Sequence, residues 1–205
     1  FQERSVITQN PHLRSDIIGC GRFSLVYRGR LNDHDVAIKV LKLRGDQSET
    51  EHVELALKEV VMCEKCAGHP HIIQLLDVAK LSKKFHGNNS LVLVFEMWGR
   101  SAETYLEEHK YILPSSRVRC IAEQCLKGLE FLHSISIIHT DVKLENILVA
   151  CCAQGCLHTK LADLGSCLIS NQDRRPDHKA SWTCVKPEKI LDLGSEAFRA
   201  PEVVF

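Results

Sequence analysis

Residues 137–148 read IIHTDVKLENIL, an apolar run that also carries His139, Asp141, Lys143 and Asn146. A buried strand has no use for such side chains, because burying an unpaired ionisable group costs free energy or forces its pKa to shift. A ligand or metal ion that compensates them would explain their presence. The stretch therefore predicts a functional site.

The composition narrows the class of protein. The chain has 205 residues, of which 44% are hydrophobic, so it can bury the core of one domain or of two small lobes. Lys plus Arg equals Asp plus Glu, 26 each, and no field of one sign can drive non-specific binding to nucleic acid or to an anionic membrane. The basic stretch KLSKK at 80–84 is typical of a solvated turn. Neither nucleic acid nor a membrane is expected as a partner.

Apolar runs and cysteine usage bear on the compartment. The longest apolar runs, 91–95 and 147–153, are far shorter than the roughly 20 residues that span a bilayer. No signal peptide is visible, and because the sequence starts at Phe1 we expect a piece of a longer protein. Ten cysteines are too few for a disulfide scaffold. The pattern favours an intracellular protein, cytoplasmic and/or nuclear.

Two groups of cysteines have spacings at which a metal ion could be bound. The motif CEKC at 63–66 lies inside a helical pattern and no second such motif follows, while Cys151, Cys152 and Cys156 form a looser cluster beside His158. Reduced thiols are favoured over a metal site in both places.

The first half of the chain reads as strands around one helix. Residues 16–31 predict a hairpin, 35–41 a strand and 51–66 a helix, followed by strands at 72–78 and 91–97. In the strand expected at 35–41, the alternation of side chains places Val36, Ile38 and Val40 on one face. It sends Lys39 to the other, otherwise apolar face.

After Met97 the pattern becomes helical. Residues 98–114 are expected to form a connection followed by a short helix, and 115–133 a strong amphipathic helix. Two short strands joined by a turn at Gly155 and a long polar loop beyond Asp163 are expected to follow. The apolar stripe of the longer helix is predicted to contain Val118, Ile121, Ala122, Cys125, Leu129 and Leu132.

The glycine-bearing turn and Lys39 suggest a nucleotide site. Gly19 and Gly21 would let the backbone approach a phosphate, although such a turn is more often only a turn. Because strands flank it on both sides, the dinucleotide fingerprint and the Walker loop are excluded, which leaves a flap over a nucleotide. Lys39 must pair with a phosphate or with a helical carboxylate, for which Glu59 is better placed than Glu54, unless it is a surface lysine on an edge strand.

The remaining polar residues fit phosphoryl transfer. Asp141 can accept or orient a hydroxyl proton and Lys143 can neutralise a moving phosphoryl group. Asn146 and Asp163 are oxygen ligands suited to Mg²⁺.

The motifs GCGRFSLV, VAIK, HTDVKLEN, DLG and APE resemble, in this order, those of the eukaryotic protein kinase domain over residues 14–205. The resemblance implies an α+β, two-lobed kinase fold, with a β-rich lobe at 1–97, a partial helical lobe at 98–205, and ATP between them. It implies that Lys39 holds phosphates and pairs with Glu59, that Asp141 is the catalytic base, that Lys143 contacts the γ-phosphate, and that Asn146 and Asp163 bind Mg²⁺.

The same resemblance implies the remaining nucleotide contacts. The loop glycines Gly19 and Gly21 are followed by Ser24 at the third glycine position. Around the adenine it places Val26, Ala37, Leu148, Phe95, Glu96 and Met97. The implied activity is that of an ATP- and Mg²⁺-dependent protein serine/threonine kinase, since Lys143 follows the base by two residues, with a protein substrate. The motifs SEAFRAPE and HPHIIQLLDV are similar to those of the group that contains the cyclin-dependent, MAP and SR-protein kinases.

Several residues depart from the family pattern. Thr140 replaces the arginine that grips a phosphorylated loop, Leu164 stands where Phe is commoner, and Cys63 is smaller than the usual residue below Glu59. The chain stops three residues after Glu202, so we expect weak or no activity from it alone; the alternative is a pseudokinase or nucleotide-binding scaffold without turnover. Candidate regulatory hydroxyls are those of Ser181, Thr183 and Ser195.

Overall fold

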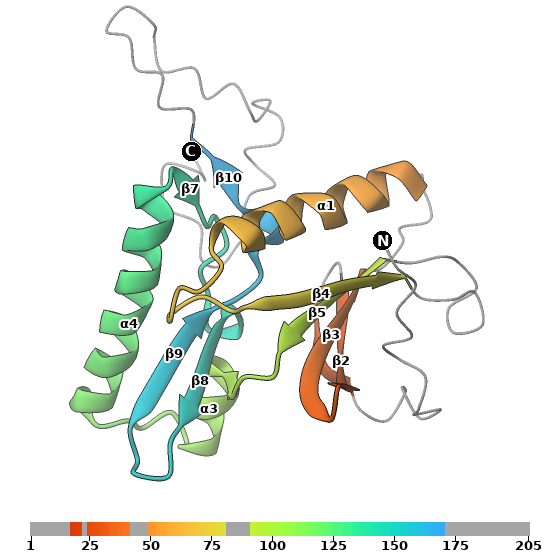
Figure 1. Ribbon diagram of the computed structural model, residues 1–205. Helices are drawn as coiled ribbons and strands as arrows, with labels where there is room; N and C mark the ends of the chain where they lie inside the picture. The colour runs from red at the N-terminus through yellow and green to blue at the C-terminus, as the bar shows by residue number, and fades with distance from the viewer. Residues whose placement is uncertain (1–16, 22–23, 42–48, 81–90, 171–205) are drawn as a thin grey trace, which may run out of the picture. The chain divides into compact units, whose positions relative to one another are not determined.

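The computed structural model describes residues 17–21, 24–41, 49–80 and 91–170 (Figure 1). The chain divides into two compact units, one formed by residues 1–68 and 73–98 and the other by residues 69–72 and 99–205. The motif APE and the hydroxyls of Ser181, Thr183 and Ser195 lie outside the described residues. The α+β class predicted from the sequence is confirmed.

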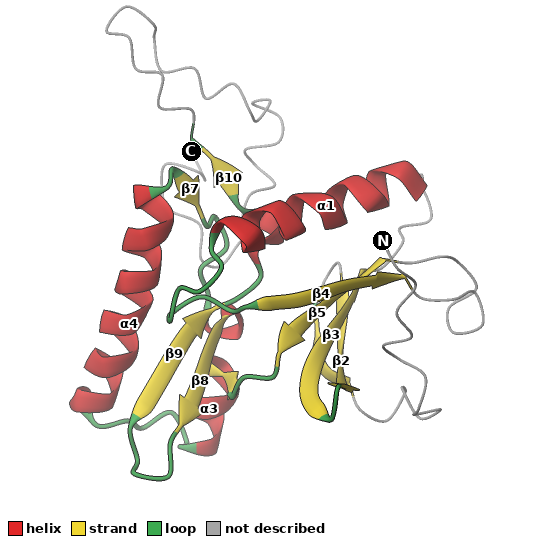
Figure 2. Ribbon diagram, in the orientation of Figure 1, coloured by secondary structure: helices red, strands yellow, loops and turns green. Residues whose placement is uncertain are grey.

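The first unit contains an antiparallel five-stranded sheet of order β1-β2-β3-β5-β4 (Figure 2). Its strands are β1 (Ile17–Cys20), β2 (Ser24–Leu31), β3 (His34–Leu41), β4 (Leu75–Lys80) and β5 (Leu91–Glu96). The register of β2 on β3 ends at the pair Leu31–His34, and the two residues between them, Asn32 and Asp33, both have positive φ. This is the two-residue hairpin geometry in which Asn and Asp are favoured.

One face of this sheet forms the core of the first unit. As the alternation predicts, Val36, Ile38 and Val40 are buried, and they pack with Tyr27 and with residues of β5. The strand expected at 72–78 starts later in the structure, where β4 begins at Leu75. Gln74, just before it, is held by the side chain of Glu96, which accepts its N–H at 2.9 Å.

Helix α1 (Glu49–Lys65) packs against β4 and β5. Its buried positions Ala56, Glu59 and Cys63 recur at helical spacing, and burying a carboxylate on this face requires a cationic partner. Gly68, with φ of +83°, follows the last turn, in keeping with the preference for glycine after a helix.

The second unit is built on helix α4 (Ser115–Ser134) and the hairpin of β8 (Ile147–Cys151) and β9 (Leu157–Leu161), with α4 packed on β9 (Figure 1). Strand β6 (Arg100–Ser101) extends the hairpin to the order β6-β8-β9, and β7 (Ile137–Ile138) pairs with β10 (Leu168–Ile169). Two single 3-10 turns, η1 (Leu144–Asn146) and η2 (Leu164–Ser166), connect these strands.

The predicted apolar stripe of α4 is partly wrong. The buried positions are Cys125, Gly128 and Leu132, whereas Ala122 is exposed and Val118, in the first turn, is 52% exposed. Gly128 lets α4 approach so closely that an added Cβ would lie 3.0 Å from the carbonyl oxygen of His71. Of the other predicted positions, Ile121 and Leu129 are partly buried.

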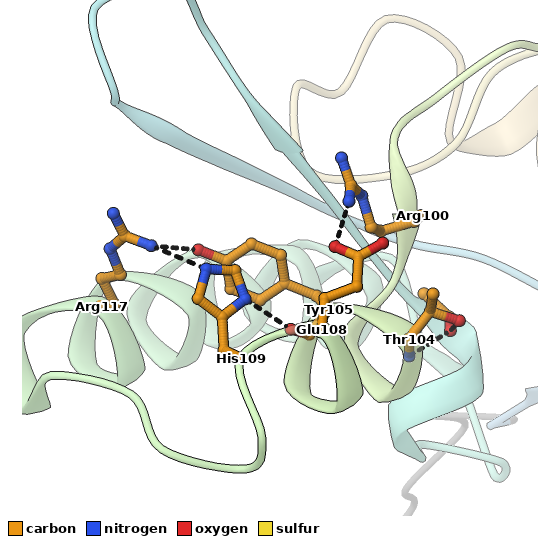
Figure 3. A network of polar contacts seen from close by, with 7 residues as sticks. Arg100, Thr104, Tyr105, Glu108, His109 and Arg117 are labelled. Atoms are coloured by element: carbon orange, nitrogen blue, oxygen red, sulfur yellow. Dashed lines mark hydrogen bonds and ion pairs between the residues drawn. The ribbon is translucent and has the colours of Figure 1, made fainter.

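Helix α3 (Ala102–Glu108) is fixed to α4 by a polar network (Figure 3). Tyr105 accepts a hydrogen bond on its hydroxyl oxygen from Arg117 Nη1 at 2.7 Å, and the same nitrogen donates to His109 Nε2 at 3.3 Å. The imidazole in turn donates from Nδ1 to the Tyr105 carbonyl at 2.8 Å. Arg100 and Glu108 form an ion pair beside this network.

Within the described ranges, no helix is both long enough and apolar enough to traverse a bilayer.

Candidate active site

The first unit contains the ion pair expected between Lys39 and Glu59. Lys39 Nζ lies 2.7 Å and 2.8 Å from the two carboxylate oxygens of Glu59, and the two side chains are 10% and 3% exposed. Strand β3 presents the lysine on the face opposite the apolar core, and α1 brings the carboxylate to it. The bidentate contact compensates both buried charges and fixes the position of the ammonium group.

The glycine-bearing turn between β1 and β2 is described on both sides of its tip. Gly21 N–H donates to the Ser24 carbonyl at 2.9 Å, and Gly19 pairs with Val26. An added Cβ would have ordinary van der Waals contacts at Gly19 and Gly21, 3.4 Å and 3.5 Å at the nearest. The fold of this unit therefore does not itself require glycine at either position.

Three side chains of the first unit lie on the same face of the sheet. Val26 is directly opposite Lys39 in the register, and Ala37 precedes Lys39 by two residues on β3. Both Val26 and Ala37 are partly exposed, unlike the core residues on the other face. They form a small apolar surface next to the lysine.

The end of β5 supplies the other positions assigned to adenine. Phe95 is opposite Ala37 and is 7% exposed, while Met97 is partly exposed just beyond the strand. Glu96 donates its N–H to the Gln74 carbonyl at 3.1 Å. A backbone contact from Glu96 to a ligand would consequently have to come from its carbonyl oxygen.

The second unit brings Asp141, Lys143 and Asn146 together. Lys143 Nζ lies 3.1 Å from Asp141 Oδ2, and Asn146 Nδ2 donates to the same oxygen at 2.9 Å and to the Asp141 carbonyl at 2.8 Å. The 3-10 turn η1 makes this possible, because Asn146 N–H donates to the Lys143 carbonyl at 3.0 Å and folds the segment back on itself. Asn146 is buried.

His139 orients this loop, a role that sequence patterning did not assign to it. The ring is 1% exposed, donates from Nε2 to the Ala162 carbonyl at 3.0 Å, and accepts the N–H of Asp141 on Nδ1 at 3.3 Å. Burial lowers the pKa of His139 below its ordinary value, although nearby Asp163 and Asp141 oppose that shift. The neutral imidazole thus joins the loop of Asp141 to the end of β9. The available signal was a histidine directly after two isoleucines, of which Ile137 is buried.

Asp163 and Thr140 have left-handed backbone conformations. Asp163 has φ 62° and ψ 67°, and Thr140 has φ 66°. Such conformations are costly for residues other than glycine and are retained where surrounding contacts fix them. Here Ala162 N–H donates to the Asn146 carbonyl at 2.8 Å, Thr140 Oγ1 donates to the Ser166 carbonyl at 2.9 Å, and Leu164 is fully buried. These contacts fix the loop after β9 that carries Asp163.

The predicted site residues are therefore distributed over both units. The first unit holds Lys39, Glu59, Gly19, Gly21, Ser24, Val26, Ala37, Glu96 and Met97. The second unit holds Asp141, Lys143, Asn146, Leu148 and Asp163, with Leu148 partly buried on β8.

The cysteine groups have a different character. Cys63 and Cys66 are buried, and burial raises the pKa of the Cys66 thiol to about 11. Across the part of the chain that the structure describes, no three His, Cys, Asp or Glu side chains are grouped so as to hold a metal ion.

Comparison with known proteins agrees with these arrangements. The family model described as protein kinase domain matches residues 13–204. The chain is 29% identical to cyclin-dependent kinase D-1 of Arabidopsis thaliana over 95% of its length, and 30% identical to the liver/testis isoform of the phosphorylase b kinase gamma catalytic chain of Homo sapiens over 92%. It is 32% identical to cyclin-dependent kinase 7 of Xenopus laevis over 73%. The chain spans 43%, 42% and 40% of these relatives, respectively. This chain belongs to the protein kinase domain family.

Proposed function

We propose that this protein is an ATP- and Mg²⁺-dependent serine/threonine kinase that transfers a phosphoryl group to a hydroxyl of a protein substrate. The observation that carries the proposal is the grouping of Asp141, Lys143 and Asn146 around one carboxylate oxygen. A carboxylate that holds a lysine and an amide at this spacing can serve phosphoryl transfer, where catalysis consists of positioning and charge neutralisation.

In this proposal the Asp141 carboxylate receives the proton of the attacking hydroxyl. Lys143, whose side chain is 20% exposed and lies 3.1 Å from the Asp141 carboxylate, is proposed to move to a phosphoryl oxygen. The neutral His139 keeps the backbone of Asp141 in place.

The residues proposed for Mg²⁺ fit a hard cation. Asn146 uses Nδ2 for its two hydrogen bonds to Asp141, which leaves Oδ1 as the atom offered to a ligand, and Asp163 contributes a carboxylate from the next loop. Magnesium accepts one or two such oxygens and takes its remaining ligands from phosphates and water. When bound, the ion would bridge phosphate oxygens and neutralise negative charge there.

The first unit supplies the groups proposed for ATP. Lys39 is fixed by Glu59 in an orientation suited to phosphate oxygens, and Gly19 and Gly21 are glycines that local packing does not demand. Close approach of a phosphate to the backbone accounts for them. Val26 and Ala37 provide an apolar surface for the base beside Lys39, and Leu148 of the second unit is proposed as a further base contact. We propose that the two units correspond to the two kinase lobes and act on one nucleotide.

Assignment to the serine/threonine class rests on Lys143, two residues after Asp141, and on the similarity to cyclin-dependent kinases. Neither feature identifies the protein substrate or an activator. An intracellular location, cytoplasmic and/or nuclear, accords with this proposal.

A phosphotransfer assay with radiolabelled ATP and Mg²⁺ on mixed protein substrates tests the proposal. We expect weak labelling of serine or threonine with the natural chain and, with Asp141→Asn, a rate lower by about two to four orders of magnitude. The exposed Glu123→Gln on α4 serves as the matched control and should retain full activity. Incorporation no higher than in Asp141→Asn, together with retained ATP binding, would indicate a nucleotide-binding scaffold instead.

A further inference from the structure

The hairpin of β8 and β9 places two cysteines directly opposite each other. Its register pairs Cys151 with Leu157, and one step further Cys152 donates its N–H to the Cys156 carbonyl at 2.9 Å. Opposite residues of antiparallel strands have Cα atoms about 4.5–5.5 Å apart, within the range that a disulfide spans. The pair is therefore set by the register.

The turn between them fixes this register. Gly155 N–H donates to the Cys152 carbonyl at 2.9 Å, and Gly155 has φ of +83°. A type I turn followed by a left-handed glycine is a common three-residue hairpin loop. In this turn the Cys152 carbonyl accepts its hydrogen bond from Gly155, so the N–H of Cys156 donates to a different atom.

That acceptor is the sulfur of Cys152, at 3.2 Å from the Cys156 nitrogen. Partial burial acts to raise the pKa of Cys152, but hydrogen bonds from the backbone of Cys156, Gln154 and Gly155 outweigh it and lower that pKa below its ordinary value. The hydrogen bond with Cys152 and its negative charge raise the pKa of Cys156. One member of the pair is thus favoured as thiolate and the other as thiol, the combination used in thiol oxidation.

We propose that Cys152 and Cys156 are a redox-active pair that closes to a disulfide across the hairpin turn when a hydroperoxide oxidises Cys152. The Cys152 thiolate attacks one peroxide oxygen, the O–O bond breaks, and the leaving oxygen takes a proton from solvent, so that the sulfur becomes a sulfenic acid. The Cys156 sulfur then attacks the Cys152 sulfur: the S–S bond forms, the S–O bond breaks, and the hydroxyl leaves as water with the proton of Cys156. The two thiols are oxidised by two electrons and the peroxide is reduced; an external dithiol reverses the step.

Four of the other described cysteines lack the accessibility that this oxidation needs. Cys63, Cys66, Cys125 and Cys167 are buried, and burial raises the pKa of Cys125, like that of Cys66, to about 11. Cys151 precedes Cys152 by one residue, so alternation directs it to the other face of the strand, and its thiol donates to the Cys152 carbonyl at 3.5 Å. Cys151 is therefore the natural control.

The pair is also distant along the strands from the candidate active site. Asn146 precedes the first residue of β8 and Asp163 follows the last residue of β9 by two positions, whereas Cys152 and Cys156 flank the turn at the opposite end. Oxidation can accordingly be measured without any assay of phosphotransfer, and its outcome is independent of the proposed function.

Mass spectrometry of the full chain tests the proposal. The reduced protein is treated with hydrogen peroxide, alkylated with N-ethylmaleimide and cut with trypsin, which releases residues 144–160 with Cys151, Cys152 and Cys156 in one peptide. We expect this peptide to carry one maleimide, located by fragmentation on Cys151, and to be lighter by about 2 Da than the same peptide with two free thiols. Reduction before alkylation should restore three maleimides.

Three variants separate the roles of the thiols. Cys152→Ser should leave its two remaining cysteines, Cys151 and Cys156, both labelled, and Cys156→Ser should leave a sulfenic acid on Cys152 that dimedone captures. Cys151→Ser should form the disulfide as the natural chain does. Guanidinium-unfolded protein should lose the preference for this pair. A maleimide retained on Cys152, equal labelling of the three cysteines in the folded protein, or disulfide formation in Cys152→Ser would overturn the proposal.

Discussion

Lys39 on β3 and Glu59 on α1 form a bidentate ion pair in which both side chains are nearly inaccessible to water, with Nζ 2.7 Å from Oε1 and 2.8 Å from Oε2. Removing one member of a buried ion pair is costly, because the charge that remains is buried without its partner. The pair therefore has to be considered in terms of stability as well as nucleotide binding.

Removing only one partner of this pair should destabilise the protein. We expect Lys39→Met to lower the free energy of unfolding by about 3 kcal/mol, since Glu59 is left buried without its cation. The double variant Lys39→Met/Glu59→Leu should recover much of that loss, because neither charge remains. Urea unfolding followed by circular dichroism measures both. The surface pair of Arg30 and Asp35 supplies the control: Asp35→Asn should change stability by less than about 1 kcal/mol. Equal effects at the two pairs would argue against the buried contact.

Buried His139 should make stability depend on pH. Its pKa is lowered in the folded protein by burial, so the unfolded chain takes up the proton more readily as the pH falls. Stability from this group is then complete above its unfolded pKa of about 6.5 and is lost as the pH falls below that value. We expect the free energy of unfolding to decline less between neutral and acidic pH in His139→Gln than in the natural chain. Because other groups titrate in both proteins, the comparison is between the two slopes, and parallel slopes would contradict the expectation.

The network between α3 and α4 in Figure 3 should contribute measurable stability. Tyr105→Phe removes the oxygen that accepts from Arg117 at 2.7 Å, and we expect a loss of about 1 kcal/mol in the free energy of unfolding. Tyr111→Phe is a matched control, because its hydroxyl reaches Glu107 at 3.3 Å on the exposed side and should contribute little. The central assumption fails if the two substitutions have the same effect in denaturant titrations.

The contact made by Thr140 bears on regulation. Its hydroxyl donates to the Ser166 carbonyl at 2.9 Å, and it carries no charge with which to hold a phosphate. We expect phosphotransfer by the expressed protein to be insensitive to phosphatase treatment, with the phosphatase removed before the assay. Activity that disappears after this treatment and returns on rephosphorylation would show that another cation holds the phosphate.

Local patterns predicted much of the fold, for reasons visible in particular residues. The alternation in β3 identified Val36, Ile38 and Lys39 correctly because burial on one face of a strand has period two. The stripe on α4 was predicted too broadly, since the close approach permitted by Gly128 depends on where His71 and Leu161 lie. That information is not local in the sequence.

The candidate site shows the same division. Motif spacing was sufficient to select Asp141, Lys143 and Asn146, which the turn η1 brings into contact. The role of His139 required knowledge that the Ala162 carbonyl lies 3.0 Å from its Nε2, a contact across 23 residues. Likewise, the left-handed conformation of Asp163 follows from the loop around it and not from the residue type.

The most direct test of the proposed function is the affinity for ATP, measured by calorimetry with and without Mg²⁺, in the natural chain, Lys39→Met, Asp163→Asn and the double variant. We predict that Lys39→Met weakens ATP binding under both conditions, that Asp163→Asn abolishes the gain produced by Mg²⁺, and that the two effects are not additive because both residues act on the same phosphates. Natural affinity and an undiminished gain from Mg²⁺ in both single variants would contradict the proposal that these residues bind one magnesium–nucleotide complex.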